Sequence, residues 1–363
     1  MNWEKRQVFD ICELAYGKSL TADSRIPGEY PVYGSAGEVG THNSYLVEGP
    51  GIIIGRKGSV GTVYYEKRNF YPIDTSYYVV IKPENDLRFF YYKLQTMGLT
   101  KLNSDAAVPG LNRNVAYEQN STFPPFSTQR KIAAILSAYD DLIENNLKRI
   151  RLLEEKVFLN YKKVMKNEIL VEGKIGNLVE IKSGFAFKSK DWSEEGFPVI
   201  KIKNIGNNDI DLINCSLIPE NVATLATSFK LNTGDLLIAM TGATVGKIGM
   251  MPKTDISYYL NQRVGIFKPK VKNAEIFLFC FFNEPSSKKT VESLASGAAQ
   301  PNISGSQIES IKMFYPVLEI VEKFGDSIKC LFELIWNLKQ QNAKLREARD
   351  ILLPRLMSGQ IEV

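Results

Sequence analysis

The segment that decides the fold is IAAILSAYDDLIENNLKRIRLLEEKVFLNYKKV (132–164), in which seam positions recur every 3.5 residues. The same spacing returns 192 residues later, from Phe324 onward. The predicted seam positions are Ile132, Leu136, Tyr139, Ile143, Asn146, Ile150 and Leu153, and then Phe324, Ile328, Leu331, Ile335, Leu338, Asn342 and Leu345. Such heptads are typical of coiled coils, and one seam alone has nothing to bury against. We therefore predict that two long helices pair as an antiparallel coiled coil; two separate amphipathic helices, each on its own domain, are the alternative.

Two asparagines interrupt these otherwise apolar seams. Asn146 and Asn342 would select the helix register at some cost in stability. The first helical segment also holds most of the surplus positive charge: residues 127–166 carry 9 basic and 5 acidic groups, in a chain of net charge +5. A basic helix face suits phosphate contacts, and a solvated coiled-coil flank explains the same charges equally well.

The rest of the chain also occurs twice. GIIIGRKGSVG (51–61) returns as GDLLIAMTGATVG (234–246), DAAVPGLN (105–112) returns as GAAQPNIS (297–304), and Pro125 matches Pro316. Short apolar runs bounded by Gly, Asn, Asp and Pro predict strands in both copies. We predict an α+β fold of two β-rich domains in tandem repeat, separated by the paired helices and related by a pseudo-two-fold axis. The predicted division is 1–126 and 167–317 for the domains, with 127–166 and 318–363 for the helices and the C-terminal tail.

Composition excludes several classes of protein. The chain has 363 residues, of which 44% are hydrophobic and 23% charged, as in ordinary globular proteins. Its longest apolar run, 276–282, is far shorter than the roughly 20 residues of a membrane helix. Four scattered cysteines without a C-x-x-C pair, and a single histidine, argue against a metal site and fit a reducing compartment. We expect a cytoplasmic protein that binds no membrane.

Catalytic motifs are missing from the sequence. It contains no G-x-x-x-x-G-K-[ST] phosphate loop and no G-x-S-x-G nucleophile elbow. The glycines of GSAGEVG (34–40) lie in a turn-rich stretch rather than between a strand and a helix, which argues against a dinucleotide or adenosylmethionine site. The two prolines of FPPF (123–126) suit a joint between a domain and a helix. We expect no catalytic residue, no metal and no cofactor.

The same layout resembles the specificity subunit of type I restriction–modification systems. The resemblance is carried by FPPFSTQRKIAAILSAYDDLIENNLKRIRLLEE (123–155), GDLLIAMTGATVGKIG (234–249), AAQPNIS (298–304) and the tail ILLPRLMSGQIEV (351–363). It implies two target-recognition domains, each reading one half of a bipartite, interrupted DNA site. It also implies docking of two adenine methyltransferase (modification) subunits on the helices, and of restriction subunits through the complex, with all catalysis in these partners. The second helix lacks the Gln129-Arg130-Lys131 start of the first, so the partner contacts of these residues are not expected to be symmetric.

Candidate DNA contacts follow from the side chains that read DNA. Arg and Lys suit guanine, Asn and Gln suit adenine, and small hydroxyl or basic groups hold phosphates. Loops at equivalent places in the two copies carry such residues: Arg56, Lys57, Ser59, Asn112 and Arg113 in the first, and Thr241, Thr244, Lys247, Asn261, Gln262, Arg263, Gln300 and Asn302 in the second. For each residue taken alone, a solvated side chain or a turn-forming asparagine is an equally good interpretation.

Three functional hypotheses remain. The first is a DNA-reading adaptor without chemistry of its own, favoured by the paired amide-rich loops and by the resemblance. The second is a coiled-coil scaffold whose domains bind proteins. The third is a methyltransferase or nuclease with an unfamiliar site, against which the missing motifs argue.

Overall fold

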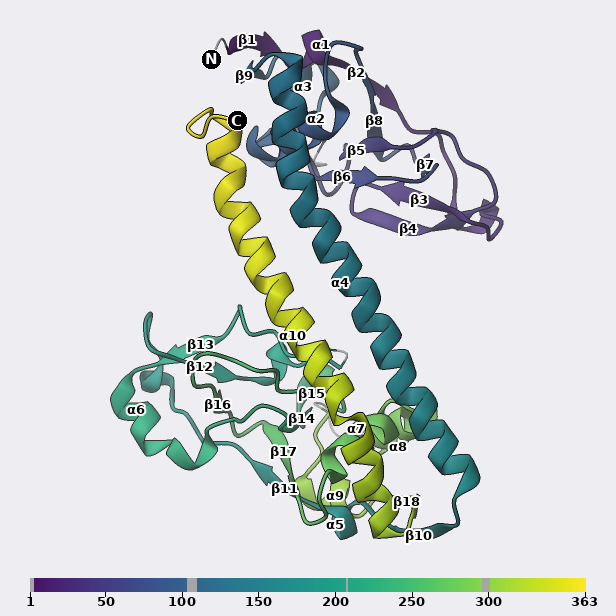
Figure 1. Ribbon diagram of the computed structural model, residues 1–363, viewed down its shortest axis with the longest axis vertical. Coiled ribbons are helices and arrows are strands. Elements are labelled where there is room, and N and C mark those ends of the chain that lie inside the picture. The colour runs from purple at the N-terminus through teal and green to yellow at the C-terminus, as the bar shows by residue number, and fades with distance from the viewer. Residues whose placement is uncertain (1–2, 103–109, 207, 296–300) are drawn as a thin grey trace. The chain divides into compact units, whose positions relative to one another are not determined.

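A computed structural model describes residues 3–102, 110–206, 208–295 and 301–363 of the chain (Figure 1). The chain divides into two compact units. The first unit comprises 1–143 and 344–363, and the second comprises 144–343. Two long helices, α4 (Phe126–Asn167) and α10 (Leu318–Met357), each contribute to both units. Within the described residues, no helix is long and apolar enough to cross a membrane.

The first unit is built around a four-stranded antiparallel sheet. Its strands lie in the order β2 (Cys12–Tyr16), β8 (Ser76–Ile81), β5 (Gly51–Gly55) and β6 (Val63–Glu66). A three-stranded sheet has the order β4 (Gly37–His42), β3 (Tyr30–Gly34) and β7 (Tyr71–Pro72), and a ribbon pairs β1 (Glu4–Gln7) with β9 (Asn120–Phe123). The short helices are α1 (Val8–Ile11), α2 (Leu87–Thr96) and α3 (Arg113–Tyr117). GSAGEVG therefore spans the β3–β4 hairpin turn, as expected for a turn-rich stretch.

The second unit repeats this topology. Its four-stranded sheet has the order β11 (Val179–Ser183), β17 (Val264–Pro269), β14 (Leu236–Ala239) and β15 (Ile248–Met250). The three-stranded sheet is β13 (Ser216–Ile218), β12 (Phe197–Ile200) and β16 (Tyr259–Leu260), and the ribbon pairs β10 (Leu170–Lys174) with β18 (Lys312–Pro316). The helices are α5 (Ile175–Leu178), α6 (Glu220–Leu225), α7 (Ala274–Phe282), α8 (Pro285–Ala295) and α9 (Gly305–Glu309). The prediction of a duplicated α+β architecture with long helices is confirmed.

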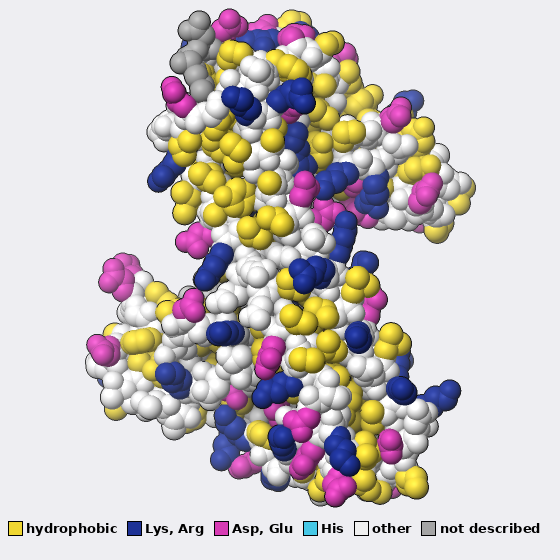
Figure 2. All heavy atoms as spheres, viewed as in Figure 1, with side chains coloured by type: hydrophobic (Ala, Val, Ile, Leu, Met, Phe, Trp, Pro, Cys, Tyr) yellow, Lys and Arg dark blue, Asp and Glu magenta, His cyan; other side chains and the backbone are white. Residues whose placement is uncertain are grey.

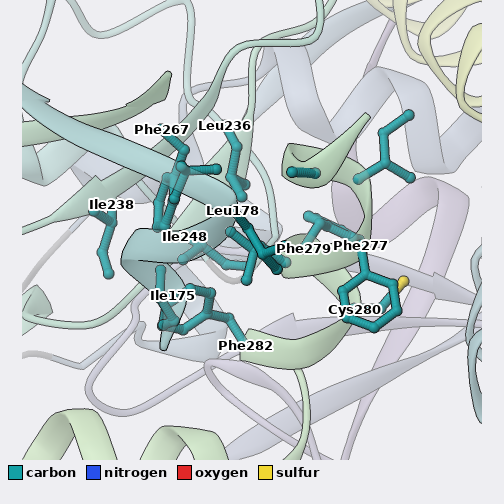
Figure 3. Packing of buried hydrophobic residues seen from close by; sticks show 14 of the residues in the cluster. Ile175, Leu178, Leu236, Ile238, Ile248, Phe267, Phe277, Phe279, Cys280 and Phe282 are labelled. Atoms are coloured by element: carbon teal, nitrogen blue, oxygen red, sulfur yellow. The ribbon is translucent and has the colours of Figure 1, made fainter. Parts of the chain in front are cut away.

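The core of the second unit explains why α7 is apolar on every side. Its sequence AEIFLFCFF packs against the sheet through Phe282, and against α4 and α10 through Phe277 and Phe279. Figure 3 shows Phe277, Phe279 and Phe282 in one buried cluster with Leu236 and Phe267 of the sheet. A helix that is apolar all round must be covered on all sides. In this unit α7 fills the space between the sheet and the two long helices.

The two long helices pair in antiparallel fashion within each unit (Figure 1). In the second unit, Ile150 packs with Ile335 and Leu338, and Asn146 Nδ2 donates to Asn342 Oδ1 at 3.0 Å. In the first unit, Arg349 Nη1 lies 2.8 Å from Asp140 Oδ1. All the predicted seam positions are buried or half-buried.

The seams are not coiled coil along their whole length. Ile132 and Leu136 join the core of the first unit, and Phe324 and Ile328 join the core of the second. The heptad positions near these ends therefore pack into a domain core to which both long helices contribute. The helix-to-helix seam is clearest around Ile150 and Leu338.

Candidate nucleic-acid interface

The loop after β5 and the segment before α3 form one surface, which we call the first rim (56–62 and 110–113). The Leu111 N–H donates to Arg56 O at 2.8 Å, and Lys57 forms a β-bridge with Gly110. The loop is tight because a Cβ on Gly55 would lie 2.1 Å from Ser59 O. Folding thus brings together all the candidates predicted in the first copy: Arg56, Lys57, Ser59, Asn112 and Arg113.

Two arginines of the first rim flank one tyrosine that the sequence reasoning missed. The guanidinium carbons of Arg56 and Arg113 lie 5.2 Å and 5.0 Å from the centre of the Tyr16 ring, which is 47% exposed. Arg56 Nε and Nη2 donate to Asp74 O at 3.1 Å and 2.7 Å. Neither guanidinium has a carboxylate partner among the residues that the structure describes. Tyr16 therefore lies against two cations that no carboxylate of the described residues neutralises.

A buried tyrosine supports this cluster from below. Tyr77 is 2% exposed, and its hydroxyl donates to Leu111 O at 3.0 Å. Its burial, together with the neighbouring Tyr16, raises the pKa of the Tyr77 hydroxyl to about 12. The phenol is thus neutral at physiological pH and joins the sheet to the second segment of the rim.

The second copy builds a corresponding surface, the second rim (241–247, 261–263 and 301–302). Thr241 forms a β-bridge with Asn302, as Lys57 does with Gly110 in the first copy. The Gly242 N–H donates to Pro301 O at 2.9 Å, and the Met240 N–H donates to Arg263 O at 3.0 Å. Three segments far apart in the sequence, with Thr241, Asn302 and Arg263, therefore meet at one edge of this unit.

A group of residues that sequence reasoning missed adjoins the second rim. Thr244 Oγ1 donates to Ile202 O at 3.3 Å, which places it beside the turn that carries Lys201. Lys201 Nζ lies 3.3 Å from the centre of the Trp192 ring and donates to Ser216 Oγ at 2.8 Å. Burial lowers the pKa of Lys201. No spacing in the sequence predicts this group, because only the pairing of β12 with β13 brings its members together.

The individual candidates have different roles in the structure. Asn112 Oδ1 accepts the Asn114 N–H at 2.9 Å and caps α3, although the residue is exposed. Asn261 is only 8% exposed and its Oδ1 accepts the Arg263 N–H at 3.2 Å, so it forms the turn instead of presenting its amide at the surface. Lys247, Gln262, Arg263 and Asn302 are exposed. Gln300 lies outside the described residues.

The start of the first long helix differs from its counterpart. Gln129 is buried; its Oε1 accepts the Asp86 N–H at 2.9 Å and its Nε2 donates to Pro124 O at 3.0 Å. It therefore holds the joint between domain and helix. In the second copy, the joint between domain and helix is held by Asn273, which precedes α7. Its Nδ2 donates to Glu322 O of α10 at 3.1 Å.

Charge alone does not mark the interface. Figure 2 shows Lys and Arg side chains interspersed with Asp and Glu over the face in view. Within the described ranges, no group of His, Cys, Asp and Glu side chains has the arrangement of a metal site. What the rims offer is hydrogen-bond donors and cations on fixed loops, which suits recognition.

Comparison with known proteins identifies the family of the chain. The family model for the type I restriction modification DNA specificity domain matches residues 1–155 and 168–347. The chain is 27% identical to the type I restriction enzyme MjaVIII specificity subunit of Methanocaldococcus jannaschii, over 100% of this chain and 93% of that protein. It is 24% identical to the MjaIX specificity subunit of the same organism, over 76% of this chain and 68% of that protein.

A solved structure has the same fold. The S subunit of a type I restriction–modification system from M. genitalium superposes with a TM-score of 0.68 at 20% identity, covering 98% of this chain and 96% of that one. The matched family regions correspond to the two copies of the repeat. The chain therefore belongs to the family of type I restriction–modification DNA specificity subunits, which supply sequence recognition and leave catalysis to other subunits.

Proposed function

We propose that this chain reads a bipartite, interrupted DNA sequence, with residues 1–126 reading one half and residues 167–317 the other. The observation that carries the proposal is the repeated rim. Equivalent β-bridges, Lys57 with Gly110 and Thr241 with Asn302, set polar loops at the same edge of two sheets of identical topology. The sequences of the two rims differ, so the two half-sites should differ as well.

The proposed DNA contacts are the exposed or half-exposed rim residues. They are Arg56, Lys57, Ser59, Asn112 and Arg113, then Thr241, Thr244, Lys247, Gln262, Arg263 and Asn302, with Tyr16 and Lys201 added from the structure. Major-groove recognition needs donors and acceptors held in fixed positions, and phosphate contacts set the register. Both kinds of group are present on each rim.

The proposed partners are two adenine methyltransferase subunits, docked on the helices of 127–166 and 318–363, and through them the restriction subunits. The proposed location is the cytoplasm, because four scattered cysteines without a C-x-x-C pair fit a reducing compartment. The family assigns catalysis to such partners. Helix residues that face away from both seams, such as Arg130 and Lys131, are exposed and available for docking.

A methylome tests the proposal. The chain would be expressed with the methyltransferase encoded beside it in a host that lacks DNA methylation, and modified adenines would be mapped by sequencing. We expect one asymmetric, interrupted motif that disappears when this chain is omitted. Association of the two proteins without any such motif would instead support the coiled-coil scaffold.

A further inference from the structure

A cavity of about 490 Å³ opens in the second unit between the four-stranded sheet, the start of α7 and the middle of α10. We call it the α7–α10 cavity. It is lined by residues that follow or precede strands of the sheet and by one face of α10, among them Gly234, Asp235, Lys253, Glu275, Lys329, Glu333 and Trp336. Its volume is in the range of cavities that bind ligands or inserted side chains.

The α7–α10 cavity is lined by three carboxylates, Asp235, Glu275 and Glu333, and by two lysines, Lys253 and Lys329. One of the carboxylate oxygens lacks a hydrogen-bond partner in the described part of the chain. Glu275 Oε2 is buried and has no hydrogen-bond partner among the described residues. Asp235, another carboxylate of the lining, has partners: its Oδ1 lies 3.6 Å from Lys268 Nζ, and its Oδ2 accepts the Asn232 N–H at 2.7 Å. Burial raises the pKa of both carboxyl groups. A buried carboxylate oxygen without a partner is costly, and a cation placed beside it would remove that cost.

The lining also offers an aromatic surface. Trp336 contributes to the cavity from α10, and its ring is close enough to Gly234 that a Cβ there would lie 3.5 Å from it. The indole ring is the strongest of the aromatic side chains in attracting cations. A carboxylate and an indole in one cavity are a suitable pair for a guanidinium group.

The first copy of the repeat shows what fills the equivalent space. Arg88 is the second residue of α2, as Glu275 is the second residue of α7. The Arg88 guanidinium carbon lies 4.0 Å from the centre of the Tyr65 ring, and its Nη2 lies 3.0 Å from Asp140 Oδ2 of α4. The first unit thus fills the space between sheet, short helix and long helix with its own arginine. The second unit has a carboxylate at that position and an open cavity.

We propose that the α7–α10 cavity receives an arginine side chain of the modification subunit, which takes in the second copy the place that Arg88 takes in the first. This inference rests on the proposed function, which supplies the partner. In this proposal, the partner supplies the arginine of the second copy, whereas the first copy supplies its own, Arg88. The arginine would pair with Glu275 and lie against Trp336.

Two substitutions of Glu275 test the proposal. Glu275→Gln keeps the shape and removes the charge, whereas Glu275→Arg supplies from within the chain the cation that the partner would bring. Glu194→Gln is the matched control, because Glu194 is an exposed residue of the same unit outside the cavity. The dissociation constant between each purified full-length chain and the modification subunit would be measured by calorimetry, with thermal unfolding of the chain alone as the check on folding.

We expect both Glu275 variants to weaken association by at least about tenfold, as the loss of one member of a buried charge pair does. The control should bind as the parent does, and Glu275→Arg should unfold no earlier than the parent. Parent-like association of both Glu275 variants would overturn the cavity proposal and leave the proposed function standing. Failure of the parent chain itself to bind the modification subunit would overturn the proposed partner and the cavity proposal together.

A photo-crosslinker identifies the inserted residue directly. Asn337 lines the cavity and is exposed, so Asn337→p-benzoylphenylalanine places the reactive group at its edge. We expect the crosslinked peptide of the modification subunit to contain an arginine whose replacement by alanine weakens association as Glu275→Gln does. A crosslinked peptide without an arginine would contradict the proposal.

Discussion

At the scale of residues, the two arginines of the first rim differ in how much of their hydrogen-bonding capacity is free. Arg56 already donates twice to Asp74 O, whereas Arg113 donates to no described residue and only packs on Tyr16 and Tyr117. A guanidinium that is fixed by the chain suits one phosphate, and a free guanidinium can offer two parallel donors to guanine. Their replacement should therefore have different effects.

We expect Arg113→Gln to lower the affinity of the complex for its own site by about 1–3 kcal/mol and to relax specificity in one half-site only. Arg56→Gln should weaken binding to all sequences alike and reduce the salt dependence by about one phosphate contact. Fluorescence anisotropy with cognate and mismatched duplexes at several salt concentrations measures both effects. Lys5→Gln, on the exposed ribbon strand β1, is the control. Equal effects of the two arginine variants on all sequences would contradict the distinction.

A buried lysine makes the stability of the first unit depend on pH. Lys93 is 3% exposed, and its Nζ donates to Met357 O, at the end of α10, at 2.8 Å. Burial lowers its pKa to about 8, below the ordinary 10.5. Between these values the unfolded chain binds more protons than the folded one, so the contribution of this group to stability rises as pH rises.

Relative to Lys93→Met, the free energy of unfolding of the parent should therefore increase by roughly 2 kcal/mol between pH 7 and pH 9.5. Urea unfolding of the two chains at both pH values measures this difference in free energy. Tyrosines that titrate at higher pH contribute equally to both chains, so their contribution cancels. A difference that does not change with pH would mean that the lysine is already neutral at pH 7 or that it leaves the core.

At the scale of elements, we expect the polar pair in the helix seam to select the helix register at some cost in stability. Asn146 and Asn342 are 6% and 1% exposed, and they bond to each other. Replacing one alone removes the hydrogen bond between the two buried amides, which costs about 1–3 kcal/mol. Replacing both with leucine makes the seam apolar and allows other registers.

We accordingly expect Asn146→Leu to lower the melting temperature and the pair Asn146→Leu with Asn342→Leu to restore or raise it. Thermal unfolding followed by circular dichroism measures the order. The complex assembled with the double variant should also methylate its site less efficiently, because alternative registers compete with the native one. If the single variant were as stable as the double variant, the asparagine pair would not be a coupled unit.

At the scale of the whole molecule, the compact units do not coincide with the two copies of the repeat. The first unit takes its C-terminal part from α10, where Leu352, Leu356 and Met357 pack against the first core. The first and last parts of the chain therefore fold together. A recognition domain cannot be exchanged without respecting this contact.

We expect exchange of residues 1–122 for those of another specificity subunit to change one half of the methylated motif and leave the other half unchanged. The exchange should keep the residues equivalent to Phe89 and Phe90, since these rings belong to the core that Leu356 completes. Mapping modified adenines before and after the exchange gives the result. A change in both halves would contradict the division of recognition between the copies.

The sequence by itself determined the duplication, the α+β class and the two long helices, because these depend on periodic apolar patterns that survive in a single chain. It also located the rim loops, since glycine and polar turn residues accompany such loops in both copies. Only the tertiary structure decided which residues meet there. Tyr16 came to lie between two arginines, Lys201 came beside Thr244, and Asn261 turned inward, since strand pairing, which joins distant segments, sets these contacts. The open cavity beside Glu275 is likewise a tertiary property, for the helix pattern of α7 and α10 is the same whether that space is filled or empty.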